Sequence, residues 1–108
     1  MGSIKEIDAL TLKNKLDQSE DFILIDVREQ IEIEICKIKK SIHIPMGLIP
    51  TRINEIDGNK TVIVMCKLGG RSAQVCHYLN EIGYLNVYNL KGGIINWALE
   101  IDTNMETY

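Results

Sequence analysis

Apolar residues gather in short runs along the chain, and polar turns separate the runs. The runs at 22–25 and 62–65 are continuous, which is typical of strands that are buried on both faces of a sheet. Shorter runs predict three further strands at 4–7, 42–44 and 86–89. The pattern therefore predicts strands in five places, spread over the whole length of the chain.

Apolar residues recur at helical spacing between most of these predicted strands. The predicted helices occupy 9–17, 72–82 and 94–100, and a shorter helical segment occupies 50–56. Because the strands alternate with helices, the pattern predicts an α/β fold with a mainly parallel sheet.

The segment 29–40 fits two patterns. Apolar and charged residues alternate over 31–35, which favours a strand. Three glutamates precede three lysines in the same segment, and this order of charges suits the dipole of a helix. We favour a short helix over 29–35, a preference that draws partly on the family resemblance given below.

The composition is that of one globular domain. The chain has 108 residues, of which 45% are hydrophobic and 25% are charged. A net charge of −3 gives no reason to expect nucleic acid or an acidic membrane as a partner. No apolar run approaches the ~20 residues of a membrane span, and the N-terminus lacks the apolar core of a signal peptide. We therefore expect a cytoplasmic protein with no membrane partner.

We assign residues 4–102 to this single domain. Residues 1–3 are either a native start or a cloning remnant. Residues 103–108 are polar, and we expect them to form a frayed tail.

The cysteines do not form a pattern typical of disulfides or zinc. Cys36, Cys66 and Cys76 are odd in number and widely spaced, and no two of them form a Cys-x-x-Cys pair. The two histidines do not complete a set of metal ligands. We expect free thiols and no metal site.

The stretch 61–72 carries the candidate chemistry. A predicted buried strand ends at Cys66, and a short loop leads from it to a helix that starts near Ser72. In parallel sheets ligands bind at the carboxyl ends of strands, and the unpaired amides of a helix start form an anion site. The residues that follow the cysteine are Lys67, Leu68, Gly69, Gly70, Arg71 and Ser72. The two glycines let the backbone curl closely, and the two cations add positive charge.

These features favour a thiolate at Cys66. A free cysteine has a pKa of ~8.5, and both a helix start and neighbouring cations lower it. The alternative is that Cys66 is a small core residue at the end of a buried strand. Two glycines and two cations directly before a helix favour the reactive interpretation.

Four motifs in this order resemble the rhodanese family of sulfurtransferases, over about residues 4–100. The loop 66–72 is similar to the family's active loop, Cys-Arg-x-Gly-x-Arg followed by serine or a similar helix starter. The other motifs are Asp-Val-Arg-Glu at 26–29, Ile-His-Ile-Pro at 42–45 and Gly-Gly-x-x-x-Trp at 92–97. The chain departs from the family at 36–41, where only Ile38 matches, and at Lys67, which replaces an arginine.

The loop length separates this resemblance from a related one. Cysteine-dependent phosphatases and thiol arsenate reductases have a similar turn, but they place five residues between cysteine and arginine. Here four residues separate Cys66 from Arg71. The tighter loop suits a terminal sulfur atom better than a tetrahedral oxyanion.

The resemblance implies a rhodanese-like fold, with a five-stranded parallel sheet flanked by helices on both faces. It also implies that the Cys66 thiolate takes the outer sulfur of a small anionic donor such as thiosulfate and becomes a persulfide. A thiol, cyanide or a protein acceptor would then remove the sulfur, and the resemblance implies that no metal or organic cofactor is needed. The amides of 67–71 would hold the outer sulfur, Lys67 would bind the donor, and Arg71 would fix the loop.

The resemblance leaves a second function open, in which Cys66 carries persulfide or senses redox state together with a partner protein. The secondary site candidates are Asp26 and Arg28. Asp26 either contacts the active loop or caps the following turn, and Arg28 is expected to pair with a nearby carboxylate. We expect Cys76 to be inert core and Trp97 to anchor the last helix.

Overall fold

The computed structural model describes residues 3–108, and its centre is a single parallel sheet. The strands are β1 (Lys5–Ile7), β2 (Phe22–Asp26), β3 (Ile42–His43), β4 (Thr61–Met65) and β5 (Val87–Leu90). They lie in the order β1-β5-β4-β2-β3, and every pair of neighbours is parallel. The fold predicted from the sequence, an α/β fold with a five-stranded parallel sheet, is confirmed.

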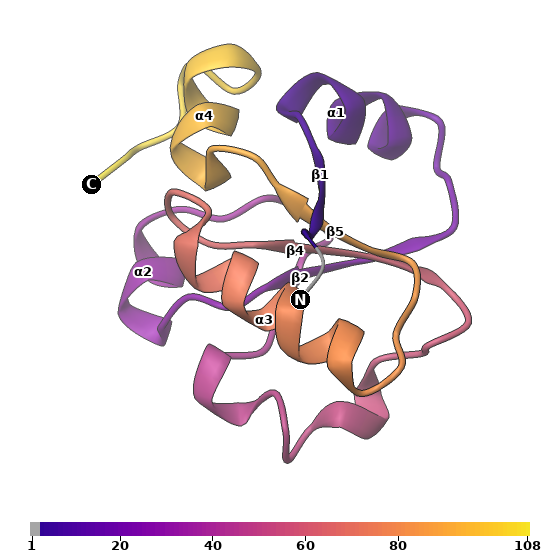
Figure 1. Cartoon of the computed structure of the whole chain (residues 1–108). Coiled ribbons are helices and arrows are strands. Elements are labelled where there is room, and N and C mark those ends of the chain that lie inside the picture. The colour runs from indigo at the N-terminus through magenta and orange to yellow at the C-terminus, as the bar shows by residue number, and fades with distance from the viewer. Residues whose placement is uncertain (1–2) are drawn as a thin grey trace.

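Four α-helices connect and cover these strands. They are α1 (Ala9–Asp17), α2 (Gln30–Ile35), α3 (Gly70–Glu81) and α4 (Gly93–Glu100). Two short 3₁₀ helices, η1 (Met46–Leu48) and η2 (Ile53–Glu55), lie between β3 and β4. In Figure 1, α1 and α4 lie on one side of the sheet and α3 lies on the other.

The helix predicted within 29–40 is confirmed as α2. Several element ends differ from the prediction by one residue, and three differences are larger. Helix α3 begins two residues before Ser72, the predicted segment 50–56 is helical only in η2, and η1 was not expected. Both 3₁₀ helices are single turns, which carry too few apolar residues to produce a clear helical period.

The central strand β4 is buried on both faces, as its continuous apolar run predicts. Val62, Val64 and Cys66 pack with α3, whereas Ile63 and Met65 pack with α1 and α4. Side chains alternate across a strand, so one run of apolar residues supplies two separate core clusters.

None of the helices in residues 3–108 is long and apolar enough to cross a lipid bilayer.

The start of α4 holds the backbone that follows β4. The amide of Ile94 donates to the carbonyl of Cys66 at 2.9 Å, and the amide of Ile95 donates to that of Lys67 at 3.2 Å. Gly93 has a φ of +61°, and a Cβ at this position would overlap the carbonyl of Lys67. The Gly-Gly motif therefore lets two backbone segments approach more closely than a side chain would permit.

We expect Gly93→Ala to lower the free energy of unfolding by about 1–3 kcal/mol, because the new methyl group strains φ and pushes against the Lys67 carbonyl. Urea denaturation measures this change. Gly47→Ala is the matched control, since no heavy atom lies within 4 Å of its Cβ position and its φ is not left-handed. Equal stability of the two variants would contradict the close approach.

Candidate active site

Cys66 lies directly after the carboxyl end of β4 and is almost fully buried, with 1% of its surface exposed. Its Sγ accepts hydrogen bonds from the amides of Gly69 at 3.1 Å and Ser72 at 3.4 Å. The hydroxyl of Ser72 lies 3.2 Å from the same sulfur. Three polar groups from the loop and from the first turn of α3 therefore surround the thiol.

These groups determine the acidity of the thiol. Burial raises the pKa of Cys66, but the hydrogen bonds from the Ser72 hydroxyl and from the amides of Ser72, Gly69 and Leu68 outweigh it, so that the pKa is lowered overall. The sequence indicated a lowered pKa, with Lys67 and Arg71 as partial causes. In the structure the largest favourable contributions are hydrogen bonds, not the two cations.

The two glycines of the loop have different roles. Gly69 caps α3 with a φ of +109°, a left-handed conformation that favours glycine. Gly70 is the first residue of α3 and does not have a positive φ. In the part of the chain that the structure describes, a Cβ at this position would meet no heavy atom within 4 Å apart from its chain neighbours and its own helix. The expectation that both glycines supply unusual backbone freedom is therefore wrong for Gly70.

Arg71 points from the first turn of α3 to a carboxylate on α2. Its two terminal nitrogens lie 2.6 and 2.9 Å from the two oxygens of Glu32, which makes the ion pair bidentate. The Arg71 guanidinium is the main reason why the pKa of Glu32 is lowered to about 2. This pair ties the loop to α2 and neutralises much of the charge that Arg71 would otherwise present to Cys66.

Tyr108 connects this ion pair with Lys67. Its hydroxyl donates to Glu32 and accepts a hydrogen bond from Arg28 at 3.0 Å. The ammonium of Lys67 lies 4.4 Å from the centre of the Tyr108 ring, within the range of a cation–π interaction. A frayed tail is predicted from the polar residues at 103–108, whereas in the structure these three contacts place the Tyr108 side chain beside the loop.

Asp26, the last residue of β2, and Arg28 form a buried ion pair. The Arg28 Nη2 lies 2.7 Å from the Asp26 carboxylate, both side chains are fully buried, and the Arg28 amide also donates to Asp26. Arg28 further donates to the carbonyl of Cys36 at 2.8 Å. Asp26 thus caps the turn after β2 and pairs with Arg28, and the link to the active loop runs through Tyr108.

Ser72 also contacts a residue that the sequence did not single out. Its hydroxyl lies 2.5 Å from Oδ1 of Asn89, near the carboxyl end of β5. The Asn89 amide nitrogen donates to the carbonyl of Gly69 at 3.1 Å and to Glu6 at 3.2 Å. One feature of the sequence could have indicated Asn89: it is a polar residue near the carboxyl end of a predicted strand. In the sheet this strand, β5, lies beside β4, the strand that precedes Cys66.

Glu32 and Tyr108 were also missed as parts of the site. The sequence indicated Glu32 only as an acid suited to a helix dipole, and Tyr108 only as part of a polar tail. Both belong to segments remote from the loop in sequence, and no local pattern connects them with Arg71 or Lys67.

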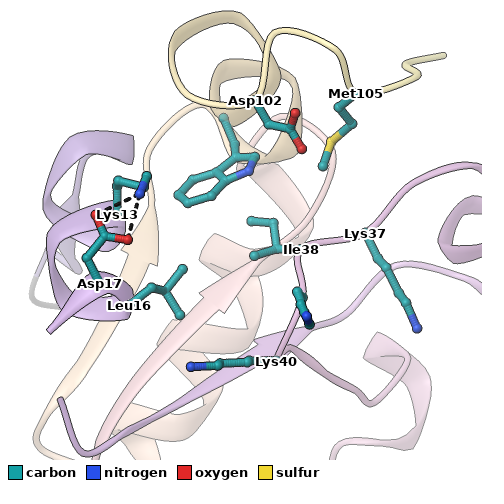
Figure 2. Close-up of a pocket in the computed structure, with 10 residues that line it drawn as sticks. Lys13, Leu16, Asp17, Lys37, Ile38, Lys40, Asp102 and Met105 are labelled. Carbon is teal, nitrogen blue, oxygen red and sulfur yellow. Dashed lines mark hydrogen bonds and ion pairs between the residues drawn. The ribbon is translucent and has the colours of Figure 1, made fainter. Parts of the chain in front are cut away.

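The Cys76 thiol and a surface pocket both lie outside the loop 66–72. Burial raises the pKa of Cys76 to about 12, so this thiol stays protonated. Among residues 3–108, no group of three or more His, Cys, Asp and Glu side chains is arranged to hold a metal ion. A pocket of about 370 Å³ lies against α1 and α4 and contains no residue of the loop. Figure 2 shows the Lys13–Asp17 ion pair on one side of it, with Ile38 and neighbouring lysines on the other.

Comparison with protein families matches residues 8–100 to the rhodanese-like domain. A sulfurtransferase of Allochromatium vinosum is 43% identical over 95 residues, which cover 88% of this chain and 89% of that protein. YtwF of Bacillus subtilis, a proposed sulfurtransferase, is 42% identical over 90% of this chain and 93% of its own length. YrkF of the same organism, a proposed sulfur carrier protein, is 34% identical over 90% of this chain and 52% of its own length.

The fold also has solved counterparts. The crystal structure of a rhodanese-like domain protein from Staphylococcus aureus superposes with a TM-score of 0.81 at 35% identity. The match covers 87% of this chain and 91% of that one. Sequence and structure comparisons therefore point to the same kind of domain.

We expect Gly69→Ala to raise the pKa of Cys66, because a left-handed φ costs an alanine about 1–2 kcal/mol and the strained loop moves its amide away from Sγ. The pH dependence of iodoacetamide alkylation, followed on the Cys66 peptide by mass spectrometry, measures the change. Gly70→Ala should titrate like the wild type, because its backbone and surroundings accept a methyl group. Similar shifts in both variants would argue against the separate roles of the two glycines.

The Arg71–Glu32 pair predicts a pH-dependent stability. The pKa of Glu32 falls from its ordinary 4.5 to about 2 on folding, so the pair stabilises the fold above pH 4.5 and loses this contribution as the pH falls toward 2. Glu32→Gln should therefore cost about 1 kcal/mol at pH 7, a modest value because water screens the partly exposed Arg71. Denaturant melts across this pH range should show the difference from wild type shrinking.

The control for this experiment is Glu34→Gln on the same helix. Among the described residues, the one side chain that donates a hydrogen bond to the Glu34 carboxylate is Gln30, one turn away. Its replacement should leave no comparable pH-dependent gap. A gap for Glu32→Gln that stays constant down to pH 2 would mean that the charge of Glu32 does not stabilise the fold.

Proposed function

The chain belongs to the rhodanese-like domain family, and from this premise we propose that it is a sulfurtransferase that carries sulfane sulfur on Cys66. The observation that supports the proposal most is the convergence of two amides and one hydroxyl on a buried Cys66 sulfur. Such a set of donors favours a sulfur that carries negative charge, and both the thiolate and a persulfide anion do so.

In the first half-reaction the Cys66 thiolate attacks the outer sulfur of a thiosulfate-like donor. A new sulfur–sulfur bond forms, the donor's sulfur–sulfur bond breaks, and sulfite leaves with the electron pair. The outer sulfur of the persulfide then carries the negative charge, and the loop amides of 67–71 stabilise it. Lys67 lies beside the cysteine in the chain and draws an anionic donor to the loop.

In the second half-reaction an acceptor nucleophile attacks the outer sulfur. A thiol or cyanide takes this sulfur, and Cys66 leaves as a thiolate that the same hydrogen bonds stabilise. Two steps that share one anion site thus replace a direct transfer between two anions that repel each other. No metal or organic cofactor takes part in this scheme.

A persulfide carrier is the second candidate function, and the proposed sulfur carrier YrkF among the relatives favours it. Leu68 lies in the loop next to Cys66 and exposes 65% of its surface. An exposed leucine beside a reactive sulfur offers an apolar contact to a protein donor or acceptor. Both candidate functions form a persulfide on Cys66. They differ in the donor, which is a partner protein for the carrier and a small molecule for the enzyme.

The test is to incubate the reduced protein with thiosulfate, remove small molecules and measure the intact mass. We expect one added sulfur atom, which is absent in Cys66→Ser and retained in Cys76→Ala, whose thiol is buried core. Addition of cyanide should then remove the sulfur and release thiocyanate.

The outcomes separate the two candidates. An adduct that forms only with a persulfidated donor protein would favour the carrier over the thiosulfate enzyme. No adduct from any donor, or an adduct that persists in Cys66→Ser, would overturn sulfur transfer through Cys66.

A further inference from the structure

The hydroxyl of Ser72 lies between two groups that compete for its single proton. It is 3.2 Å from Sγ of Cys66 and 2.5 Å from Oδ1 of Asn89. A serine hydroxyl donates one hydrogen bond but can accept others. It can therefore donate to the sulfur or to the amide oxygen, but not to both.

The orientation of Asn89 follows from its other contacts. Its nitrogen faces two acceptors, the carbonyl of Gly69 at 3.1 Å and the carboxylate of Glu6 at 3.2 Å. An amide oxygen in that place would face two other oxygens without a proton between them, so Oδ1 must face Ser72. Ser72 is fully buried and Asn89 is 2% exposed, which leaves no water to replace a lost partner.

We propose that Asn89 is a positioning residue that keeps the Ser72 proton away from Cys66 as long as the sulfur is neutral. In the thiol form, Cys66 donates its proton to the Ser72 oxygen, and Ser72 donates to Asn89. When Cys66 ionises, its proton leaves to solvent and the Ser72 hydroxyl turns toward the thiolate. Asn89 then loses its donor inside the protein, so Asn89 favours the thiol and Ser72 favours the thiolate.

This competition has a consequence for sulfur transfer, which rests on the proposed function. A thiolate of higher pKa is intrinsically more nucleophilic, so Asn89 raises the reactivity of each Cys66 thiolate while it lowers the fraction of Cys66 that is ionised. Once the persulfide has formed, the Cys66 sulfur is neutral, and the Ser72 proton can return to Asn89. The same switch then opposes release of the thiolate in the second half-reaction, which limits its net effect on turnover.

Other charged or titratable groups surround the site from each neighbouring element. They are Lys67 in the loop, Arg71 and Cys76 on α3, Glu32 on α2 and Glu6 on β1. Arg71 is paired with Glu32, and Glu6 accepts from Asn89. Within residues 3–108, none of their side chains donates a hydrogen bond to Sγ. Asn89→Leu also removes the hydrogen bonds from Asn89 to Glu6 and to the Gly69 carbonyl. This loss is the same with and without the Ser72 hydroxyl, so the switch is measured as the difference between the two backgrounds.

The experiment is a double-mutant cycle on the thiol pKa, measured from the pH dependence of iodoacetamide alkylation at the Cys66 peptide. Asn89→Leu should lower the pKa by about one pH unit, which is a roughly tenfold change in acidity. Ser72→Ala should raise it. In the Ser72→Ala background, Asn89→Leu should no longer lower the pKa, because the proton for which Cys66 and Asn89 compete is gone.

A matched control and a second variant keep the test decisive. Asn86→Leu, just before β5, replaces an exposed asparagine that contacts Thr61 and should leave the pKa unchanged. Asn89→Asp should raise the pKa of Cys66, and the rise should be larger with Ser72 present than in the Ser72→Ala background. This second variant tests the same proposal if Asn89→Leu folds poorly.

The opposite sign for Asn89→Leu, no change, or equal shifts in both backgrounds would overturn the role of Asn89. Alkylation needs no sulfur donor, so this result is independent of the thiosulfate adduct. Failure of the adduct would refute sulfur transfer and leave the measured order of thiol pKa values in place.

Discussion

Cys66 is buried, and burial opposes the negative charge that its chemistry needs. The loop after β4 resolves this conflict with hydrogen bonds. Amides at the start of α3 point at the sulfur, while amides at the start of α4 bind the carbonyls of Cys66 and Lys67. Two helix starts thus hold one turn of backbone, one by facing the sulfur and the other by binding the carbonyls beside it. The parallel sheet matters because it brings both helix starts to the same edge.

A second set of contacts holds this turn from the side of α2. Arg71 is bound to Glu32, Glu32 accepts from Tyr108, and Tyr108 accepts from Arg28, which pairs with Asp26. Within residues 3–108, every buried side-chain nitrogen and oxygen has a hydrogen-bond partner. Each charged group in this series of contacts is hydrogen-bonded to a neighbour. Arg28 and Arg71 therefore act mainly by fixing the positions of the segments that they connect. This explains why hydrogen bonds, more than free cations, lower the pKa of the thiol.

The fold could be predicted from local patterns to a large extent. The continuous run in β4 required burial on both faces, and the structure places alternate residues of that run in two core clusters. Helices α1, α3 and α4 followed from apolar spacing; α1 has the predicted bounds, and the ends of α3 and α4 differ by at most two residues. The 3₁₀ helices η1 and η2 were poorly anticipated, since single turns leave almost no periodic signal.

Local sequence is enough to specify the strand before Cys66, the helix that follows it, and the glycines at 69 and 93 that such backbone requires. The side chains that complete the site come together through contacts between distant segments. Ser72 and Asn89 are 17 positions apart, Arg71 and Glu32 are 39 apart, and Tyr108 and Glu32 are 76 apart. Hydrophobic period and helix capping act over a few residues, so they position each element but carry no information about its distant neighbours. The order of strands in the sheet creates these contacts, and with them the environment of the sulfur.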